Sequence, residues 1–94
     1  MINSRKKGKR GELEAAKVWS KLFGVEMRRS QQFCGRSDES DDIIGQPGVS
    51  FEVKRTARTN VQRVVAKAVE DAAEGRVPVV LHRGDHQPWL VSLQ

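Results

Sequence analysis

The sequence has little cysteine, no long apolar run and no low-complexity segment, and each absence narrows its class. Cys34 is the single cysteine in 94 residues and lacks the partner spacing of a zinc site, so we expect a small packing residue in a reducing compartment. No apolar run approaches the roughly 20 residues of a membrane-spanning helix, and residues 1–12 lack the apolar stretch of a signal peptide. We therefore expect one cytoplasmic domain over residues 1–94, with no membrane association and one modest core.

Basic residues outnumber acidic ones and are grouped along the chain. Seventeen Lys and Arg against twelve Asp and Glu give a formal net charge of +5. This balance favours a polyanionic partner, nucleic acid first and an anionic membrane second. The basic residues that we expect to contact nucleic acid lie around an acidic knot at residues 37–42 and are Arg5, Lys6, Lys7, Lys9, Arg10, Arg28, Arg29, Arg36, Arg55 and Arg58.

Residues 10–24 have the periodicity of an amphipathic helix that ends at Gly24. At roughly 100° per residue, one apolar stripe is formed by Ala15, Ala16, Trp19, Leu22 and Phe23. Glu12 falls within this stripe, whereas Glu14 is expected to point to solvent. A carboxylate on an inward face needs a cation, a metal ion or a polar cleft as its partner. The alternative is that Glu12 only stabilises the first turn of the helix, where acids are favoured.

The rest of the chain predicts a mixed α/β fold without internal repeats. A second helix is indicated at residues 59–75, with Thr59 or Asn60 as its N-cap and Gly75 at its end. Its apolar stripe consists of Val61, Val64, Val65, Ala68 and Ala72. Strands are indicated at residues 25–33, 42–45, 49–55, 77–82 and 88–93. The order α-β-β-β-α-β-β predicts a central mixed β-sheet flanked by helices.

The histidines and tryptophans have structural explanations. His82 and His86 flank the Arg-Gly-Asp turn at residues 83–85 and are expected in a hairpin loop, where a spacing of four does not bring side chains together, so we expect no zinc site. Trp19 and Trp89 are expected in the core rather than as platforms for base stacking. The last two strands also contain apolar residues that are open to either core or dimer contact, namely Val79, Val80, Leu81, Leu90 and Val91.

The segment DDIIGQPGVSFEVKR, residues 41–55, brings charged side chains together. Its Gln-Pro-Gly turn predicts an antiparallel hairpin centred near Pro47. Asp42 then lies opposite Glu52, and Lys54 shares their face because it follows Glu52 by two residues. Two carboxylates so close repel each other, which costs stability unless a cation lies between them.

A divalent metal ion would relieve this repulsion. Mg²⁺ takes oxygen ligands and usually keeps several waters, so Asp42, Glu52 and the backbone carbonyl of Val53 are suitable ligands. Lys54 would orient an attacking water or stabilise negative charge that develops on phosphorus. The metal would polarise the phosphoryl oxygen and help to generate hydroxide. These parts indicate hydrolysis of a phosphodiester with Mg²⁺, or Mn²⁺ as its substitute, while the basic residues hold the phosphate backbone.

The same residues resemble a known family. DII, followed ten residues after Asp42 by EVK, resembles the motif of PD-(D/E)XK nucleases, and KGKRGE resembles the N-terminal glutamate helix of archaeal and phage Holliday junction resolvases. Similarity to small phage and prophage endonucleases extends over nearly the whole chain, through RR..Q, PG…EVKR and VPVV.HR…PWLV. The resemblance implies a restriction-endonuclease-like core and an Mg²⁺-dependent DNA endonuclease, with branched DNA such as a Holliday junction as its substrate and a phage or prophage origin.

The resemblance also implies roles for individual residues. Asp42 and Glu52 would bind the metal ion, and Lys54 would assist the nucleophile. Glu12 would orient water, contact a metal ion or support the site. Asp41 stands where the name of the motif has proline, and the pairing register favours Asp42 over Asp41 as the ligand.

Two further positions stay open in this comparison. Resolvases use a loop serine before the aspartate, which corresponds to Ser37 or Ser40, and we place Ser37 among the DNA contacts. Some relatives carry a glutamine on the second helix near the site, and either Gln62 or Lys67 is near that position.

Three classes of function fit this composition: a metal-dependent DNA endonuclease, a nucleic-acid-binding module that kept the fold without cleavage, and an assembly protein with a solvated charged surface. A pure binding module does not need Asp42, Glu52 and Lys54 on one face. Glu12 on an apolar stripe argues against the assembly protein. A chain of 94 residues has little surface to grip both arms of a DNA junction, so we also expect a two-fold homodimer.

Overall fold

The computed structural model describes residues 4–30 and 41–94, with side chains from residue 8 onward, and contains two helices and five strands within them. The elements in chain order are α1 (Ser4–Phe23), β1 (Arg28–Arg29), β2 (Ile43–Ile44), β3 (Val49–Arg55), α2 (Val61–Asp71), β4 (Val77–Arg83) and β5 (Leu90–Ser92). This order confirms the predicted mixed α/β class with helices flanking a mixed sheet.

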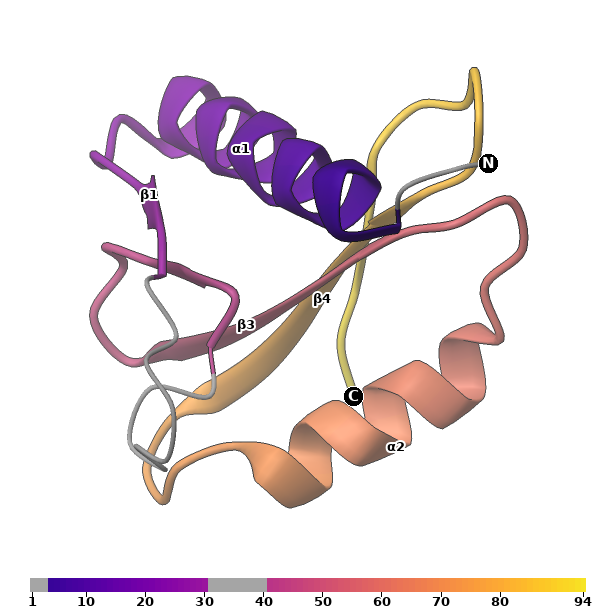
Figure 1. The fold of residues 1–94 in the computed structure, drawn as a ribbon. Coiled ribbons are helices and arrows are strands. Elements are labelled where there is room, and N and C mark those ends of the chain that lie inside the picture. The colour runs from indigo at the N-terminus through magenta and orange to yellow at the C-terminus, as the bar shows by residue number, and fades with distance from the viewer. Residues whose placement is uncertain (1–3, 31–40) are drawn as a thin grey trace.

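The strands form two sheets of unequal size. β3 and β4 run parallel, from the pair Val49↔Val77 to the pair Arg55↔Arg83, and β5 joins the other edge of β4 antiparallel. β1 and β2 form a short antiparallel ladder next to β3. The helix α1 lies on one face of the long strands and α2 lies on the other (Figure 1). β3 is therefore an outer strand of the larger sheet, and the segment before β2 passes along its open edge.

The core lies between α1 and the sheet. Ala15, Ala16 and Trp19 are buried on the inner face of α1, as the sequence predicts. The Trp19 ring meets the Phe51 ring edge-on, with their centroids 4.9 Å apart. Trp89 is half-buried against the same cluster, so both tryptophans take the predicted core role. The remaining buried apolar side chains are Met27, Ile43, Val53, Val79, Val80 and Leu81.

The N-terminal end of α1 differs from the prediction, whereas its C-terminal end at Gly24 confirms it. The helix begins at Ser4, well before residue 10, and ends where Gly24 takes a φ of 65° and donates its N–H to Ser20 O. Leu22 and Phe23 were expected in the core, which is wrong, because they are 65% and 57% exposed. Phe23 packs on the outer side of Trp19, with the ring centroids 4.3 Å apart, instead of reaching the sheet.

The predicted hairpin of residues 42–45 and 49–55 is wrong in its strand partners. β2 pairs with β1 through Arg29↔Ile43, and β3 pairs with β4. The two segments still meet at Asp42, whose N–H donates a 3.0 Å hydrogen bond to Phe51 O. The predicted strand at residues 25–33 is reduced to β1, and its last part lies outside the described residues, as does Cys34.

Helix α2 covers the second face of the sheet with a half-buried stripe. Asn60 is its N-cap and accepts a 3.1 Å hydrogen bond from Arg63 N–H. All five residues of the predicted apolar stripe are half-buried, and none is fully buried. The helix ends at Asp71 rather than at Gly75, because Ala72 already has extended backbone angles. Gly75, with a φ of 83°, belongs to the turn that leads into β4.

Glu14 ties α1 to the ends of the two parallel strands. Its carboxylate lies 2.6 Å from Arg83 Nη1 and 3.5 Å from Arg55 Nε. The prediction that Glu14 points to solvent is therefore wrong. Arg55 and Arg83 follow Glu14 by 41 and 69 residues along the chain. The periodicity of a helix cannot predict contacts at such separations. Arg55 packs against Gly11, where an added Cβ would lie 2.9 Å from the Arg55 Cβ.

The C-terminal hairpin of β4 and β5 completes the sheet. His82 lies within β4 and not in the loop, and its Nε2 is 2.8 Å from Ser92 Oγ on β5. Val79, Val80 and Leu81 are buried, so they belong to the core, whereas Leu90 and Val91 are exposed. Neither described helix is long and apolar enough to cross a bilayer.

The backbone at Gly45 lies close to Glu26 and Met27, and a substitution of Gly45 tests this close approach. Its φ is 141°, and a Cβ at this position would collide with the backbone oxygen of Glu26 and the side chain of Met27. We expect Gly45→Ala to lower the free energy of unfolding by about 2 kcal/mol or more, measured by urea denaturation. Gly48→Ala is the matched control, because Gly48 also has a positive φ but has open space around it. Equal losses in the two variants would contradict the close approach.

Candidate functional site

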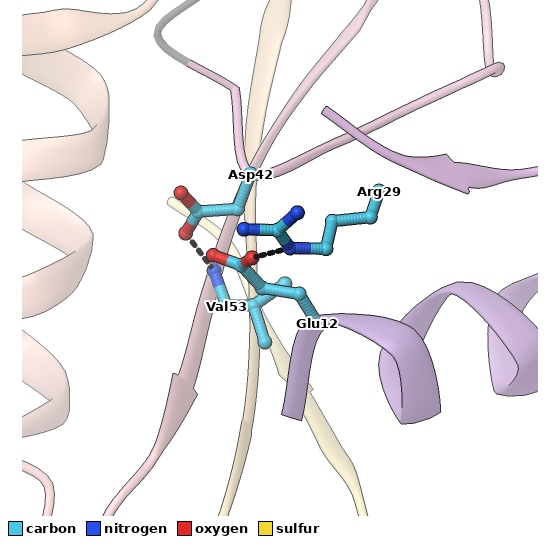
Figure 2. Close-up of polar contacts among 4 residues, drawn as sticks. All are labelled: Glu12, Arg29, Asp42 and Val53. Carbon is cyan, nitrogen blue, oxygen red and sulfur yellow. Dashed lines mark hydrogen bonds and ion pairs between the residues drawn. The ribbon is translucent and has the colours of Figure 1, made fainter. Parts of the chain in front are cut away.

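Asp42 is attached to the open edge of β3 at two points. Its N–H donates to Phe51 O at 3.0 Å, and its Oδ2 accepts from Val53 N–H at 2.8 Å (Figure 2). Phe51 and Val53 are two residues apart, so both present their backbone groups to the same edge of the strand. The Asp42 carboxylate is thereby held beside the residue between them, Glu52.

Glu52 and Lys54 lie on the α2 side of β3. Phe51 and Val53, which alternate with them, are buried on the α1 side. Lys54 Nζ lies 3.6 Å from Glu52 Oε1. Burial raises the pKa of Glu52, and the charges of Lys54 and Lys67 partly offset this rise.

Lys67 of α2 therefore faces the site, whereas Gln62 lines a groove between α2 and β5. The sequence left open which of the two residues lies near the site. They are five positions apart and so differ by roughly 140° around the helix, and the packing of α2 on the sheet directs only Lys67 toward Glu52. Lys67 adds a second positive charge next to this carboxylate.

The Asp42 carboxylate is electrostatically strained. Its pKa is raised from 3.8 to about 7, mainly because the group is buried and also because the negative charges of Glu52 and Glu12 lie nearby. The hydrogen bond from Val53 and the charge of Lys54 favour the ionised form but do not compensate. Asp42, Glu52 and Lys54 thus lie together, as the sequence predicts, although the pairing of strands differs from the prediction. Glu12 is part of the same electrostatic cluster, a position that the family resemblance implies.

Glu12 reaches this cluster from α1, on the opposite layer from α2. Its Oε1 accepts a 2.7 Å hydrogen bond from Arg29 Nε, and the side chains are 20% and 35% exposed. Figure 2 shows the two side chains meeting beside Asp42 and β3. A carboxylate on the inward face needs a cation, a metal ion or a polar cleft as its partner, and Glu12 has a cation, Arg29.

Asp41 differs from Asp42 in its contacts. It is 5% exposed, and Ser50 Oγ donates to its Oδ1 at 2.5 Å while Arg76 Nη1 lies 3.2 Å from its Oδ2. Both oxygens of Asp41 are thus engaged by β3 and by the turn before β4. This arrangement gives Asp41 a structural role and leaves Asp42 as the carboxylate in the cluster. That Asp42 is a metal ligand stays a prediction.

The donor set at this edge suits a hard divalent cation. Within residues 8–30 and 41–94, no three His, Cys, Asp or Glu side chains are arranged to hold a metal ion together. Mg²⁺ commonly uses only one or two carboxylates and completes its shell with water. Asp42 and Glu52 supply those carboxylates. The Val53 carbonyl lies on the same strand edge as the Val53 N–H that bonds Asp42, so the residues present fit Mg²⁺.

The predicted DNA-contacting residues fall into different settings. Those with exposed positions are Lys9, Arg10, Arg28 and Arg58. Arg29 and Arg55 are half-buried and engaged with Glu12 and Glu14. The backbone of Arg5, Lys6 and Lys7 lies in α1, and their side chains are outside the described residues. Arg36, Ser37 and Ser40 also lie outside them.

Sequence reasoning missed the residues that hold the acids in place. Arg29 was counted only as a nucleic-acid contact, and Arg76 and Ser50 were not singled out at all. Ser50 had a usable signal, because it precedes Glu52 by two residues and so shares its strand face. Arg76 had none, since its contact with Asp41 spans 35 residues.

The site is assembled from three segments, namely α1, the residues just before β2, and β3 (Figure 2). Comparison of the chain with protein-family models, curated proteins and solved structures found no match. Any function is therefore inferred from the positions and charges of these side chains.

The raised pKa of Asp42 predicts a pH-dependent gain in stability when its charge is removed. Because the pKa is about 7 in the folded protein and near 3.8 when unfolded, the free energy of unfolding falls as the pH rises from about 4 to about 7. Asp42→Asn keeps an oxygen that can accept from Val53. In metal-free buffer, it should raise the melting temperature by several degrees at about pH 8, and much less at about pH 4.5. A melting temperature lowered by Asp42→Asn at both pH values would exclude the strained carboxylate.

The neighbouring aspartate should respond in the opposite direction. Asp41→Ala leaves the buried Ser50 hydroxyl without its acceptor and removes the partner of Arg76. We expect a loss of about 2 kcal/mol in the free energy of unfolding, measured by denaturant titration. If Asp41→Ala and Asp42→Asn shifted stability in the same direction at about pH 8, the division of roles between the two aspartates would be wrong.

Proposed function

We propose that the chain is a metal-dependent DNA endonuclease that hydrolyses phosphodiester bonds, with Asp42, Glu52 and Lys54 at its centre. The observation that supports it best is the half-buried Asp42 carboxylate, which Val53 N–H holds at the edge of β3 and whose pKa is raised to about 7 by burial and by the nearby charges of Glu52 and Glu12. A chain with a net charge of +5 has many cations, yet at this edge it gathers three acids. Such a cluster costs stability, which a bound divalent cation would restore.

The residues divide the chemistry between them. Asp42, Glu52 and the Val53 carbonyl would hold Mg²⁺, or Mn²⁺ in its place. When bound, the metal ion supplies a Lewis acid for the phosphoryl oxygen and lowers the pKa of a bound water. Lys54, 3.6 Å from Glu52, places a positive charge where negative charge develops on the phosphoryl group. The half-buried setting of these groups strengthens their mutual interactions.

The DNA backbone would be held by the exposed cations of α1, β1 and the loop before α2. Branched DNA such as a Holliday junction is the substrate that the family resemblance implies, together with a phage or prophage origin in a bacterial cytoplasm. A two-fold homodimer would place two such sites on one junction. Leu90 and Val91, 55% and 46% exposed on the outer strand β5, are the apolar residues that stay available for that contact.

A nucleic-acid-binding module without cleavage is the second candidate. The pairing of Glu12 with Arg29, and the absence of a third acidic ligand among the described residues, favour this reading. It explains the exposed cations equally well. It leaves the strained Asp42 carboxylate without a role, which is why the endonuclease is preferred.

The endonuclease predicts that chemistry and binding can be separated. In the presence of Mg²⁺ or Mn²⁺, the purified protein should cleave supercoiled plasmid or a four-way junction, and EDTA should stop the cleavage. Asp42→Asn, Glu52→Gln and Lys54→Ala should each reduce the cleavage rate by about 100-fold or more. DNA affinity, measured by fluorescence anisotropy, should change little. Asp42→Asn is the most informative variant, because it is expected to be inactive and yet more stable.

Matched controls exist on the exposed surface. Glu70→Gln on α2 and Lys17→Ala on α1 repeat the same charge changes away from the site. Full cleavage by Glu52→Gln and Lys54→Ala would show that the site is wrongly assigned. Tight DNA binding with no cleavage of any DNA form by the unmodified protein would favour the binding module.

A further inference from the structure

Arg29 occupies an unusual position for a residue on a basic surface. Its neighbour Arg28 is exposed, whereas Arg29 turns inward from β1 and forms the 2.7 Å ion pair with Glu12. The register Arg29↔Ile43 places Arg29 next to the segment that begins with Asp42, and Ser30 N–H donates to Asp42 O at 3.0 Å. The ladder between β1 and β2 therefore positions both Asp42 and the Arg29 guanidinium. Figure 2 shows the Arg29 and Glu12 side chains next to Asp42.

The pair affects how much negative charge the cluster offers to a cation. Glu52 and Glu12 both lie near Asp42, and the charge of Glu12 contributes to the raised pKa of Asp42. With Arg29 in place, the Glu12 charge is largely balanced and one of its oxygens is engaged. A divalent cation that approaches Asp42 therefore meets a positive charge nearby, which lowers its affinity for the cluster.

The pair is also accessible to a second anion. The Arg29 side chain is 35% exposed, and a guanidinium has five donors, of which the contact to Glu12 uses the one on Nε. Arginine binds phosphate as readily as carboxylate, often through two parallel hydrogen bonds. A DNA phosphate at this surface can therefore replace Glu12 as the partner of Arg29. The negative charge of Glu12 is then no longer balanced.

We propose that Arg29 is an internal counter-ion that competes with the divalent metal ion for Glu12, and that a DNA phosphate relieves this competition. The inference rests on the proposed endonuclease and adds a regulatory step to it. Metal binds weakly while Arg29 holds Glu12, and binds more tightly once DNA draws Arg29 away. Because such coupling is reciprocal, the metal ion strengthens DNA binding by the same factor. Arg29 acts through Glu12 and is a positioning residue.

Mn²⁺ affinity, measured by isothermal titration calorimetry, tests this step without any cleavage. Arg29→Gln should bind Mn²⁺ at least about fivefold more tightly than the unmodified protein when DNA is absent. Arg28→Gln removes the same charge from the adjacent, exposed position of β1, and should change the affinity less than about twofold. In a Glu12→Gln background, Arg29→Gln should have no further effect, because the competed carboxylate is gone.

The coupling to DNA is measured with Lys54→Ala in every protein, so that the DNA stays intact. A short duplex should tighten Mn²⁺ binding when Arg29 is present and should leave it unchanged in Arg29→Gln. Circular dichroism melts confirm that each variant is folded, and Arg29→Met, which keeps the unbranched stem, replaces Arg29→Gln if the latter is not.

The outcomes distinguish this inference from the proposed function. Equal effects of Arg28→Gln and Arg29→Gln would mean that only overall charge matters, and weaker Mn²⁺ binding by Arg29→Gln would mean that the pair builds the site instead of blocking it. Either result would refute the counter-ion role of Arg29. The proposed endonuclease would still be supported if Mn²⁺ binding and cleavage depend on Asp42. If the unmodified protein binds no Mn²⁺ and cleaves no DNA, the endonuclease itself fails, and the counter-ion fails with it.

Discussion

The attachment of Asp42 to the open edge of β3 is the interaction on which the rest of the site depends. One bond uses its backbone N–H and the other uses its carboxylate, so the side chain is held in a fixed orientation beside Glu52. β3 can offer these groups because it is an outer strand, with β4 on its other side only. Had another strand paired along this edge, the Phe51 carbonyl and the Val53 amide would be consumed by the sheet.

The cluster is costly, and the surrounding structure holds it in place. Asp41 is bound by Ser50 and Arg76, which fixes the chain directly before Asp42. On the other side, Glu14 ties α1 to the ends of β3 and β4, which fixes the helix that carries Glu12. The repulsion at Asp42 is thus maintained by long-range contacts elsewhere, a pattern that is typical of functional sites.

Local patterns predicted most of the elements but not their partners. The Asn60 cap and the C-terminal hairpin follow from turn residues and periodicity, and they are confirmed. The stripe of α1 is confirmed for Ala15, Ala16 and Trp19 and wrong for Leu22 and Phe23. The expected pairing of residues 42–45 with 49–55 is wrong, because Gly45 passes close to Glu26 and Met27 and β2 pairs with β1. Even so, the hairpin argument placed Asp42 beside Glu52, since a short turn limits how far the two segments can separate.

The sequence by itself determined the order of the helices and strands and the inward direction of Glu12, but not that of Glu14, because side-chain periodicity is a property of neighbouring residues. Its spacing placed Asp42, Glu52 and Lys54 together without coordinates, and the family resemblance added Glu12. Only the tertiary structure decided which cation each acid meets. Glu12 pairs with Arg29, Asp41 pairs with Arg76, and Glu14 pairs with both Arg55 and Arg83. These pairs join residues 17 to 69 positions apart, and such contacts depend on how whole elements pack rather than on any local pattern.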